Sequence, residues 1–332
     1  MKAIVYDRFG KADVLRLADV PRPEPRAGDI LVNVKALGVN RADLLQREGY
    51  YGNQTYGESP LLGLELAGEV IEVGADVNDV TPGERVMAIV GGGAYAEYAR
   101  VDRAMAVRIP DGLTFVEGAA VMESFVTAWE ALVHLGEVKF GNTVLIHAAA
   151  GGIGSAAVQI GHALGARVLA TATASRRSQV EALGAKRVFD YLGEDFEAGV
   201  REVTDGLGVD VVVDFVGGDY FGRNLRSLKP GGRLVQVGLL SGEENVEIPL
   251  GLVLHNHLRV IGTVMKSRSI DEKRAMVQRF AEHGLPLLSE GSLRPVVGEI
   301  FSLAGASEAQ RYMETGGGFG KIVLNVDDDI EV

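Results

Sequence analysis

Glycine residues at a fixed spacing mark the stretch of this sequence best suited to hold a ligand. The apolar run Val144–Ile146 predicts a buried parallel strand, and a helical pattern that we expect from Ser155 to Leu164 follows it. Between them, glycines let the backbone turn tightly, while a helix N-terminus offers free N–H groups and a positive dipole end to phosphates. We therefore expect a dinucleotide pyrophosphate to bind at Ala148, Gly151, Gly152, Ile153 and Gly154.

The motif reads Ala148-x-x-Gly151-x-x-Gly154, so alanine stands where the usual G-x-G-x-x-G pattern has its first glycine. A second strand, predicted from Arg167 to Thr171, completes a strand-turn-helix-strand unit. This context favours nucleotide binding over a buried helix that is merely rich in glycine. No charged residue lies between Thr143 and Ala166, yet glycines, histidines and a glutamine make this segment too polar to span a membrane.

The residues after the second strand indicate which coenzyme is used. An NAD site places Asp or Glu about 20 residues past the glycines, to bind the ribose hydroxyls. The stretch 170–178 has no acid and contains two arginines. A 2′-phosphate would meet donors at Thr173, Ser175, Arg176 and Arg177, which predicts NADPH. The alternative is that these arginines only begin a solvated helix face.

Composition limits the function classes. The 332 residues suggest about two domains, and 47% hydrophobic with 23% charged residues is ordinary for a globular protein. A net charge of −12 argues against a nucleic-acid partner. The absence of cysteine excludes disulfides and thiolate metal sites and fits a reducing cytoplasm. The first residues, MKAIVYDRFG, do not form a secretory signal.

Further strands predict a doubly wound parallel sheet. Apolar runs at 187–191, 209–215, 233–237 and 259–264 follow the first two strands, giving six in all. Ligands of such sheets bind where the strands end. We therefore expect the following strand-end residues to contact the coenzyme, with Tyr191 on the adenine: Tyr191, Gly217, Gly238 and Leu239.

The sequence before and after this sheet predicts a second, mainly β domain. Short strands are expected at 2–6, 30–36, 66–73, 87–90 and 106–109, with a short helix at 40–47. A helical pattern at 115–135 leads into the nucleotide unit, and a helix is expected at 272–283. The strands predicted at 296–301 and 321–326 suggest that the chain then returns to its first domain.

Several short motifs, in this order, point to a family. They are Gly38-Val-Asn-Arg-Ala-Asp43, Leu62-Gly-Leu-Glu-Leu-Ala-Gly-Glu69, Gly91-Gly-Gly-Ala-Tyr-Ala-Glu-Tyr98, His147-Ala-Ala-Ala-Gly-Gly-Ile-Gly154 and Gly320-Lys-Ile-Val-Leu324. The whole chain resembles the medium-chain dehydrogenase/reductase superfamily and, within it, the zinc-independent NADPH quinone oxidoreductases. The first and third motifs resemble the damage-inducible subgroup among the zeta-crystallin relatives. The resemblance implies a GroES-like catalytic domain at 1–122, a Rossmann NADPH-binding domain at 123–265 and a return to the catalytic domain at 266–332.

One departure from the wider superfamily concerns metal. Its zinc-dependent alcohol dehydrogenases carry Gly-His-Glu-x-x-Gly, with histidine as a ligand, whereas this chain has Gly63-Leu64-Glu65. Leucine cannot coordinate zinc and the cysteine ligands are missing, so we expect neither a catalytic nor a structural zinc. The six histidines show no metal-ligand spacing, and structural roles are expected for them.

The resemblance also implies roles for single residues. Asn40 and Tyr51 would lie beside the nicotinamide, with Asn40 a hydrogen-bond donor or acceptor near the reacting carbonyl. Tyr51 would line the cleft, either as the proton donor or as an aromatic wall. Thr127 would contact the nicotinamide unless its hydroxyl bonds to its own helix. Lys321 would reach the coenzyme or remain solvated.

These observations predict an NADPH-dependent, metal-free quinone oxidoreductase that transfers hydride directly. The alternatives are an ene-reductase acting on alkenals or enoyl thioesters, and a non-catalytic NADPH-binding protein. The physiological acceptor is left open. The β-branched segment 258–264 could present a sheet edge, and with the resemblance it predicts a homodimer.

Overall fold

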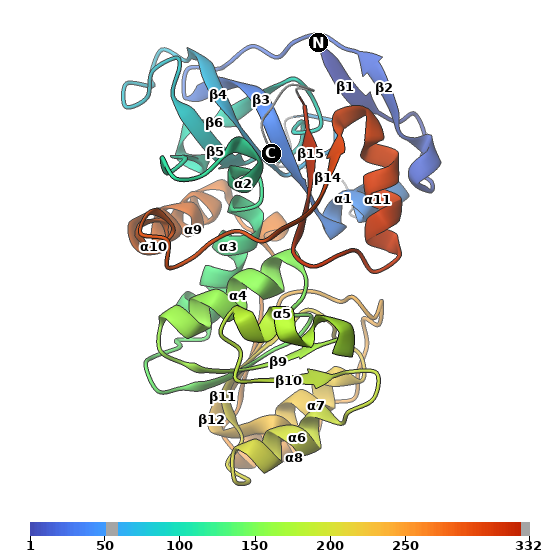
Figure 1. Cartoon of the computed structure of the whole chain (residues 1–332), viewed down its shortest axis with the longest axis vertical. Coiled ribbons are helices and arrows are strands. Elements are labelled where there is room, and N and C mark those ends of the chain that lie inside the picture. Colours follow the sequence, from blue (N-terminus) through green and yellow to red (C-terminus); the bar gives the residue numbers. More distant parts are fainter. Residues whose placement is uncertain (51–58, 327–332) are drawn as a thin grey trace. The chain divides into compact units, whose positions relative to one another are not determined.

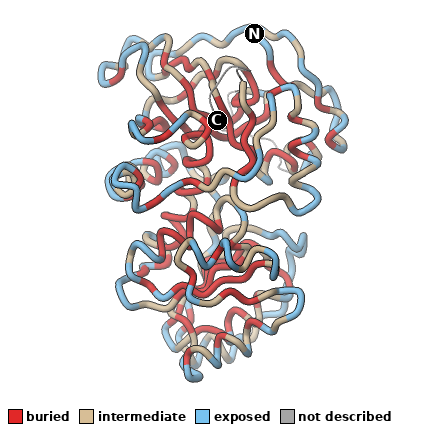
Figure 2. The backbone as a smooth tube through the Cα atoms, in the orientation of Figure 1, coloured by how far each residue is buried: buried red, intermediate tan, exposed pale blue. Residues whose placement is uncertain are grey.

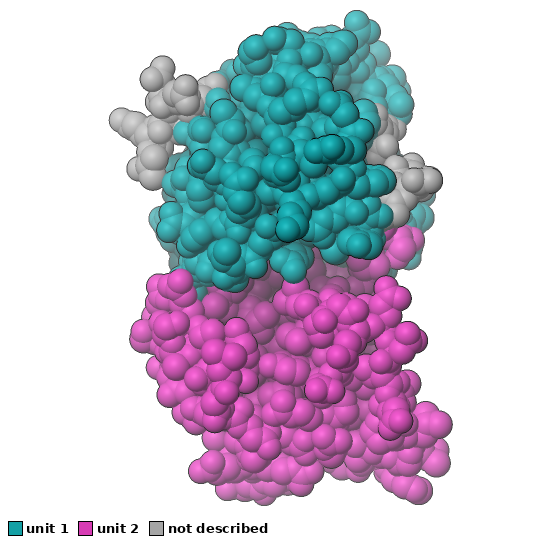
Figure 3. Space-filling model, turned by 90° about the vertical axis from the view of Figure 1, so that its right-hand side faces the viewer, with its two compact units in different colours: residues 1–126, 268–332 teal, residues 127–267 magenta. Residues whose placement is uncertain are grey.

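The computed structural model describes residues 1–50 and 59–326 and divides into two compact units (Figures 1 and 3). Unit 1 comprises Met1–Val126 and Arg268–Val332, and unit 2 comprises Thr127–Ser267. The chain thus leaves the first unit once and returns to it. The assignment of these parts as catalytic and coenzyme-binding domains remains a prediction.

Unit 2 contains a six-stranded, entirely parallel sheet in the order β10-β9-β8-β11-β12-β13. The strands are β8 (Thr143–Ile146), β9 (Arg167–Ala172), β10 (Arg187–Asp190), β11 (Val209–Asp214), β12 (Leu228–Gln236) and β13 (Arg259–Gly262). Each strand contains apolar residues, and the most buried runs of Val, Ile and Leu lie in β8 and β11, as is typical of a parallel sheet covered by helices on both faces. The predicted doubly wound sheet is therefore confirmed, and its direction of winding reverses at β8, where a ligand crevice is expected.

Helices connect these parallel strands, as right-handed crossovers require. They are α4 (Gly152–Ala163), α5 (Arg177–Ala182), α6 (Phe196–Val203), α7 (Tyr220–Ser227) and α8 (Leu250–His255). Most boundaries differ from the prediction by one or two residues, and two differ by more. Helix α4 begins at Gly152, one turn before Ser155. Strand β12 begins at Leu228 because that residue already pairs with Val209, before a register shift.

Unit 1 contains a seven-stranded mixed sheet in the order β14-β15-β3-β4-β5-β7, with β6 paired to β3. Its strands are β3 (Asp29–Val39), β4 (Glu65–Val73), β5 (Arg85–Ile89), β6 (Tyr98–Asp102), β7 (Ala106–Arg108), β14 (Val297–Ser302) and β15 (Lys321–Asn325). Strands β1 (Lys2–Val5) and β2 (Arg16–Asp19) form a separate two-stranded sheet. Strand β15 pairs antiparallel with β3, so a strand from the last part of the chain lies in the same sheet as strands from the first part.

The helices of unit 1 range from 4 to 14 residues in length. They are α1 (Arg41–Glu48), α2 (Phe115–Gly118), α9 (Ile270–His283), α10 (Leu285–Ser289) and α11 (Ala306–Glu314). The helical pattern predicted at 115–135 is broken into α2, then α3 (Met122–Trp129), then a π-helical turn at Glu130–Leu135. Each unit has its own buried core, and the buried residues are the red stretches of the tube in Figure 2. Within residues 1–50 and 59–326, no helix combines the length and the apolar composition needed to cross a membrane.

Candidate functional site: a glycine turn and a buried polar cluster

The glycine turn of unit 2 connects β8 to α4 and brings backbone N–H groups to the carboxyl edge of the sheet. Helix α4 begins at Gly152, so the amides of Gly152, Ile153 and Gly154 have no acceptor within the helix. Ala148 takes the first glycine position of the motif with φ +49°, a left-handed conformation that a non-glycine residue rarely adopts. A Cβ on Gly154 would overlap the Ala148 carbonyl oxygen and lie 2.7 Å from the Cα of Ala149. Gly154 therefore allows the helix to pack closely against the turn.

A buried hydrogen-bond network holds the strands on both sides of this turn. His147 Nε2 lies 2.7 Å from Asn224 Oδ1, and His147 Nδ1 lies 3.0 Å from Thr171 Oγ1. Because Asn224 Nδ2 donates to Asp214 Oδ2 (2.9 Å), its Oδ1 must accept the proton on His147 Nε2. Burial lowers the pKa of His147, against the opposing effect of Asp214, so the ring is neutral near pH 7. His147 has the structural role expected for the histidines.

Asp214 extends this network to the next strand end. Its carboxylate accepts the backbone N–H groups of Val216 (2.7 Å) and Gly217 (3.1 Å). Gly217 has φ +69°, which favours glycine at this turn. The network thus fixes the backbone on which Gly217 lies.

The remaining strand-end residues lie on the same carboxyl edge. Tyr191 comes directly after β10, and Gly238 and Leu239 come two and three residues after β12. The side chains of Tyr191 and Leu239 are 46% and 47% exposed, so both are free to pack on a ligand. Their role in coenzyme binding stays a prediction.

The residues expected to hold a 2′-phosphate follow β9, and their donors are engaged to different extents. The Thr173 and Ser175 hydroxyls lie 3.0 Å apart. Arg176 makes one long hydrogen bond, 3.3 Å, to Gln179. Arg177 forms an ion pair with Glu194, which also pairs with Arg187. Glu194, which follows β10, thus places an acid beside Arg177, although residues 170–178 themselves contain none.

In unit 1, the Asn40 side chain is held by three residues. Its Nδ2 donates to Glu65 Oε1 (3.0 Å) and to the Gly38 carbonyl (3.3 Å), while its Oδ1 accepts from Lys321 Nζ. Both amide protons are therefore used, and one lone pair of Oδ1 remains. Of the two roles expected for Asn40, only that of an acceptor is left to it in this arrangement.

Lys321 lies at the start of β15 and is 5% exposed. Its ammonium pairs with Glu65 Oε1 and donates to Asn40. The alternative of a solvated lysine is therefore wrong, because the ammonium is buried against a carboxylate and an amide oxygen. Whether Lys321 contacts the coenzyme stays a prediction.

Glu65 is the centre of this cluster, and the sequence analysis assigned it no role. Its Oε1 binds Asn40 and Lys321, and its Oε2 accepts the backbone N–H of Glu123 (2.9 Å). A Cβ on Gly38 would collide with the Glu65 carboxylate, so glycine at 38 makes room for it. This charge is fully buried and needs the ammonium of Lys321 beside it.

Two further acids complete the cluster and were also missed. Asp43 Oδ2 accepts the backbone N–H of Asn40 (2.8 Å) and the hydroxyl of Tyr95 (3.0 Å), yet burial raises the pKa of Asp43 to about 7. Burial, together with the nearby Glu65 carboxylate, raises the pKa of Glu123 to about 8. Such raised values in one cluster of acids are a feature of functional sites.

The other predicted residues are placed as follows. Tyr51 lies outside the described residues. Thr127 lies in α3, and its hydroxyl bonds neither to its own helix nor to another described residue. Leu64 is a buried apolar side chain, 3% exposed. Among the residues described, no group of three or more His, Cys, Asp or Glu side chains is arranged to hold a metal ion.

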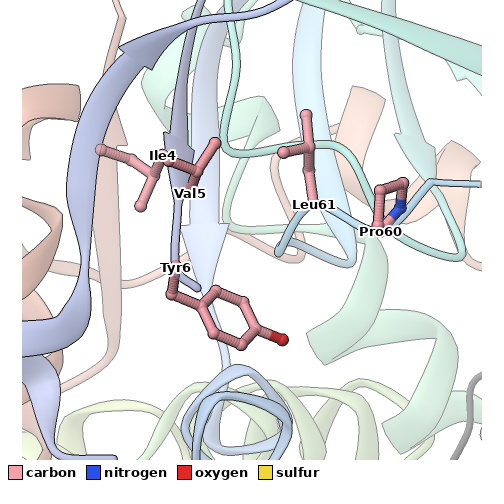
Figure 4. A pocket seen from close by; sticks show the side chains of 5 residues that line it. All are labelled: Ile4, Val5, Tyr6, Pro60 and Leu61. Carbon is pink, nitrogen blue, oxygen red and sulfur yellow. The ribbon is translucent and has the colours of Figure 1, made fainter. Parts of the chain in front are cut away.

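A small apolar recess lies elsewhere in unit 1. Its volume is about 170 Å³ and it is lined by Ile4, Val5, Tyr6, Pro60 and Leu61 (Figure 4). Burial raises the pKa of the Tyr6 phenol, which is hydrogen-bonded to Gln46 of α1. The recess alone is below the size of a typical small-molecule site and carries no charged group.

Two sequence families match the chain. Residues 26–111 match the alcohol dehydrogenase GroES-like domain, and residues 152–282 match a family described as zinc-binding dehydrogenase. The chain is 32% identical over 89% of its length to a quinone oxidoreductase-like protein 2 homolog of Nematostella vectensis, of which it covers 81%. It belongs to the medium-chain dehydrogenase/reductase superfamily, with the GroES-like and Rossmann parts that the resemblance implied.

Other relatives are much larger proteins, of which this chain matches only a part. It is 34% identical, over 96% of its length, to a mycocerosic acid synthase-like polyketide synthase of Mycobacterium tuberculosis, but it spans only 15% of that protein.

Solved structures of the same fold have been described under different activities. An NAD-dependent alcohol dehydrogenase superposes with TM-score 0.89 at 33% identity, covering 98% of this chain and 100% of the other. The Escherichia coli quinone oxidoreductase complexed with NADPH gives 0.89 at 28% identity with the same coverage. The CurK enoyl reductase gives 0.88 at 27%, covering 98% and 99%.

Proposed function

We propose that this protein is an NADPH-dependent reductase whose preferred acceptor is a quinone. The observation that carries the proposal is the glycine turn of α4, whose amides and closely packed Gly154 fit a dinucleotide pyrophosphate. Arg176, at the rim after β9, supports the phosphorylated coenzyme. The similarity to a quinone oxidoreductase that binds NADPH supports both parts of the proposal.

The residues of unit 2 divide the work of holding the coenzyme. The amides of Gly152, Ile153 and Gly154 would bind the pyrophosphate, Arg176 with Thr173 and Ser175 the 2′-phosphate, and Tyr191 the adenine. Gly217, Gly238 and Leu239 would line the rest of the edge. When bound, the coenzyme supplies a hydride. The protein contributes mainly proximity and orientation. In unit 1, Asn40 would accept a hydrogen bond from an N–H or O–H of the bound ligands.

We infer that the reaction needs no metal. Leu64 offers no ligand atom, the chain has no cysteine, and the Asn40 amide is bonded to the Lys321 ammonium rather than open to a cation. A conjugated acceptor spreads the charge that a hydride delivers, so it does not need a Lewis acid. We expect full activity after dialysis against EDTA and less than about 0.1 equivalent of zinc by elemental analysis. Activity that EDTA removes and zinc restores would contradict this.

The second candidate is an ene-reductase, which the similarity to CurK enoyl reductase and to a polyketide synthase favours. Steady-state kinetics with NADPH should compare 1,2-naphthoquinone, an acrolein-type alkenal and crotonyl-CoA. We expect the highest kcat/KM with the quinone. A higher value with either of the other two would select the ene-reductase. Tight NADPH binding without turnover on any acceptor would indicate a non-catalytic protein.

We also propose a homodimer formed through β13, the edge strand of the unit 2 sheet. Val260 on this strand is 45% exposed, and Val264 just beyond it is 47% exposed. Such an edge can pair with a second copy of itself. Light scattering at micromolar concentration should give a mass of about twice 35.3 kDa. A single-chain mass would exclude the dimer.

A further inference from the structure

The reduction of a carbonyl acceptor needs a group that gives a proton to the acceptor oxygen. In the cluster around Glu65, the groups that are partly exposed are Asn40 and Glu123, whereas Asp43, Glu65 and Lys321 are buried. Asn40 has no donor left, because both its amide protons are bonded to Glu65 and Gly38. A partly exposed proton donor within this cluster must therefore be another residue.

Glu123 is placed to be that residue. Its backbone N–H binds Glu65 Oε2 (2.9 Å), which fixes the start of α3 against the cluster. Its carboxyl, in contrast, makes no hydrogen bond to any described residue and is partly exposed. Among the described residues, no side chain or backbone group competes with a ligand or water for this carboxyl.

The charges facing Glu123 favour the protonated form. Glu65 of β4 and Asp43 of α1 are acids that oppose a second negative charge, and Lys321 of β15 is the cation among them. Lys321 is already paired with Glu65, so its effect on Glu123 is smaller than that of burial and of Glu65. The pKa of Glu123 is consequently raised to about 8, so the carboxyl carries its proton at neutral pH.

We propose that Glu123 is the proton donor of the reduction, with its carboxyl hydrogen-bonded to the acceptor oxygen. This rests on the proposed function, in which the reduced nicotinamide gives two electrons and one hydrogen as hydride to the acceptor. The O–H bond of Glu123 breaks, and a new O–H bond forms on the acceptor oxygen, which becomes a hydroxyl. The positive charge of Lys321 favours the carboxylate that remains, and the partial exposure of Glu123 lets it take a proton back from water.

The first test is Glu123→Gln, which keeps the size of the side chain but cannot release a proton. We expect kcat with 1,2-naphthoquinone to fall by about 100-fold or more, the range for loss of a general acid. The dissociation constant for NADPH should change by less than about twofold. Glu123→Asp, which keeps the acid, should recover at least about tenfold over Glu123→Gln. Glu308→Gln, an exposed acid on α11, makes the same charge change and should leave the rate unaltered.

The pH profile gives a readout that a purely structural role would not move. The wild-type rate should fall as pH rises through about 8, because the acid is then lost, and this limb should be absent in Glu123→Gln. In the protein without ligands, ¹³C NMR of labelled glutamate side chains should show one carboxyl titrating near pH 8 that disappears in this variant.

Three results would overturn the proposal. They are an unchanged kcat and pH limb in Glu123→Gln, a Glu123 carboxyl that titrates near 4.5, or a Tyr51→Phe variant that alone removes the limb above pH 8. The failure of the proposed function has a different signature. In that case the wild-type protein would oxidise NADPH with none of the acceptors, and the role of Glu123 would fall with it.

Discussion

The two buried polar networks, one in each unit, differ in how completely their hydrogen bonds and charges are paired. The network of unit 2 joins His147, Thr171, Asn224 and Asp214, and every side chain in it has its hydrogen-bond partners. It contains one carboxylate, which is satisfied by backbone N–H groups and by an amide. The cluster of unit 1 places three carboxyl groups, those of Asp43, Glu65 and Glu123, around the single ammonium of Lys321.

The difference indicates which network is suited to proton transfer. A fully satisfied network makes its surroundings rigid. The network of unit 2 therefore fixes the backbone beside the glycine turn, where the coenzyme is proposed to bind. Burial raises the pKa of Asp43 to about 7 and, together with the nearby Glu65 carboxylate, that of Glu123 to about 8, so both acids hold protons near neutral pH. A site that stores a proton near neutral pH is suited to give it away.

The largest expected effect comes from removing the cation of unit 1. Lys321→Met leaves the buried Glu65 carboxylate without its partner and should destabilise the protein by about 3–5 kcal/mol. The double variant Lys321→Met with Glu65→Gln should regain part of this loss, because the unpaired charge is gone. Urea unfolding followed by circular dichroism measures both.

Lys2→Met is the matched control, because Lys2 pairs with Asp19 while the two side chains are 50% and 76% exposed. It should cost at most about 1 kcal/mol. A similar cost for Lys2→Met and Lys321→Met would mean that the cluster is not held by its buried charge.

The second prediction uses opposite pH dependences of the two networks. The pKa of Asp43 is about 7 in the folded state against 3.8 normally, so the folded state holds an extra proton between these values. Relative to Asp43→Asn, the wild-type protein should therefore gain stability as pH falls from about 7 to 4, by at most about 1.4 kcal/mol per pH unit.

His147 behaves in the other sense, because its pKa is lowered below the usual 6.5. Below that pH the unfolded chain binds the extra proton. Relative to His147→Gln, the wild-type protein should lose stability as pH falls below about 6.5. Urea unfolding at each pH between 4 and 8 tests both signs, with His283→Gln, at an exposed position, as the control. Slopes of the same sign for both sites would remove the contrast between the networks.

The third prediction concerns the glycine turn between β8 and α4. Gly154→Ala adds a Cβ that overlaps the backbone of Ala148 and Ala149, and should cost about 1–3 kcal/mol in stability. It should also weaken NADPH binding, because the first turn of α4 must shift. In Gly151→Ala the new Cβ lies 3.5 Å from its nearest neighbour, so the fold should tolerate it. Equal unfolding midpoints for the two variants would show that the turn can accommodate a Cβ at position 154, which would contradict the close packing seen in the structure.

Local patterns explain why so much of unit 2 could be predicted from the sequence. Strands buried on both faces appear as short apolar runs, and such runs predict all six strands, including the more exposed edge strand β13. The sequence predicts that α4 begins at Ser155, and the preceding Gly152-Ile153-Gly154 has a weak helix propensity. Packing of Gly154 against Ala148 outweighs that propensity and brings the start forward by one turn.

The acids of unit 1 could not be predicted, because their properties arise from contacts between distant residues. Asn40 and Lys321 were identified through the resemblance, but nothing in the sequence places them in contact across 281 positions. Glu65 lies within a recognised motif and Glu123 within an expected helix. Neither local pattern shows that the two meet. A raised pKa depends on burial and neighbouring charge, which the fold alone creates.

The smallest expected effect concerns coenzyme choice by the residues that follow β9. The sequence alone gives Arg176 and Arg177 the same predicted role in binding the 2′-phosphate. The structure separates them, because Arg177 is paired with Glu194 whereas Arg176 makes only a 3.3 Å hydrogen bond to Gln179. Arg176→Ala should therefore raise the KM for NADPH about tenfold, which is about 1.4 kcal/mol, and change that for NADH less than twofold. Arg177→Ala should have a smaller effect on NADPH. Arg201→Ala on α6, 56% exposed, removes the same charge and should alter neither coenzyme. Equal use of NADPH and NADH by the wild-type protein would show that neither arginine binds the 2′-phosphate. An effect of Arg177→Ala as large as that of Arg176→Ala would show that the ion pair with Glu194 does not keep Arg177 from the phosphate.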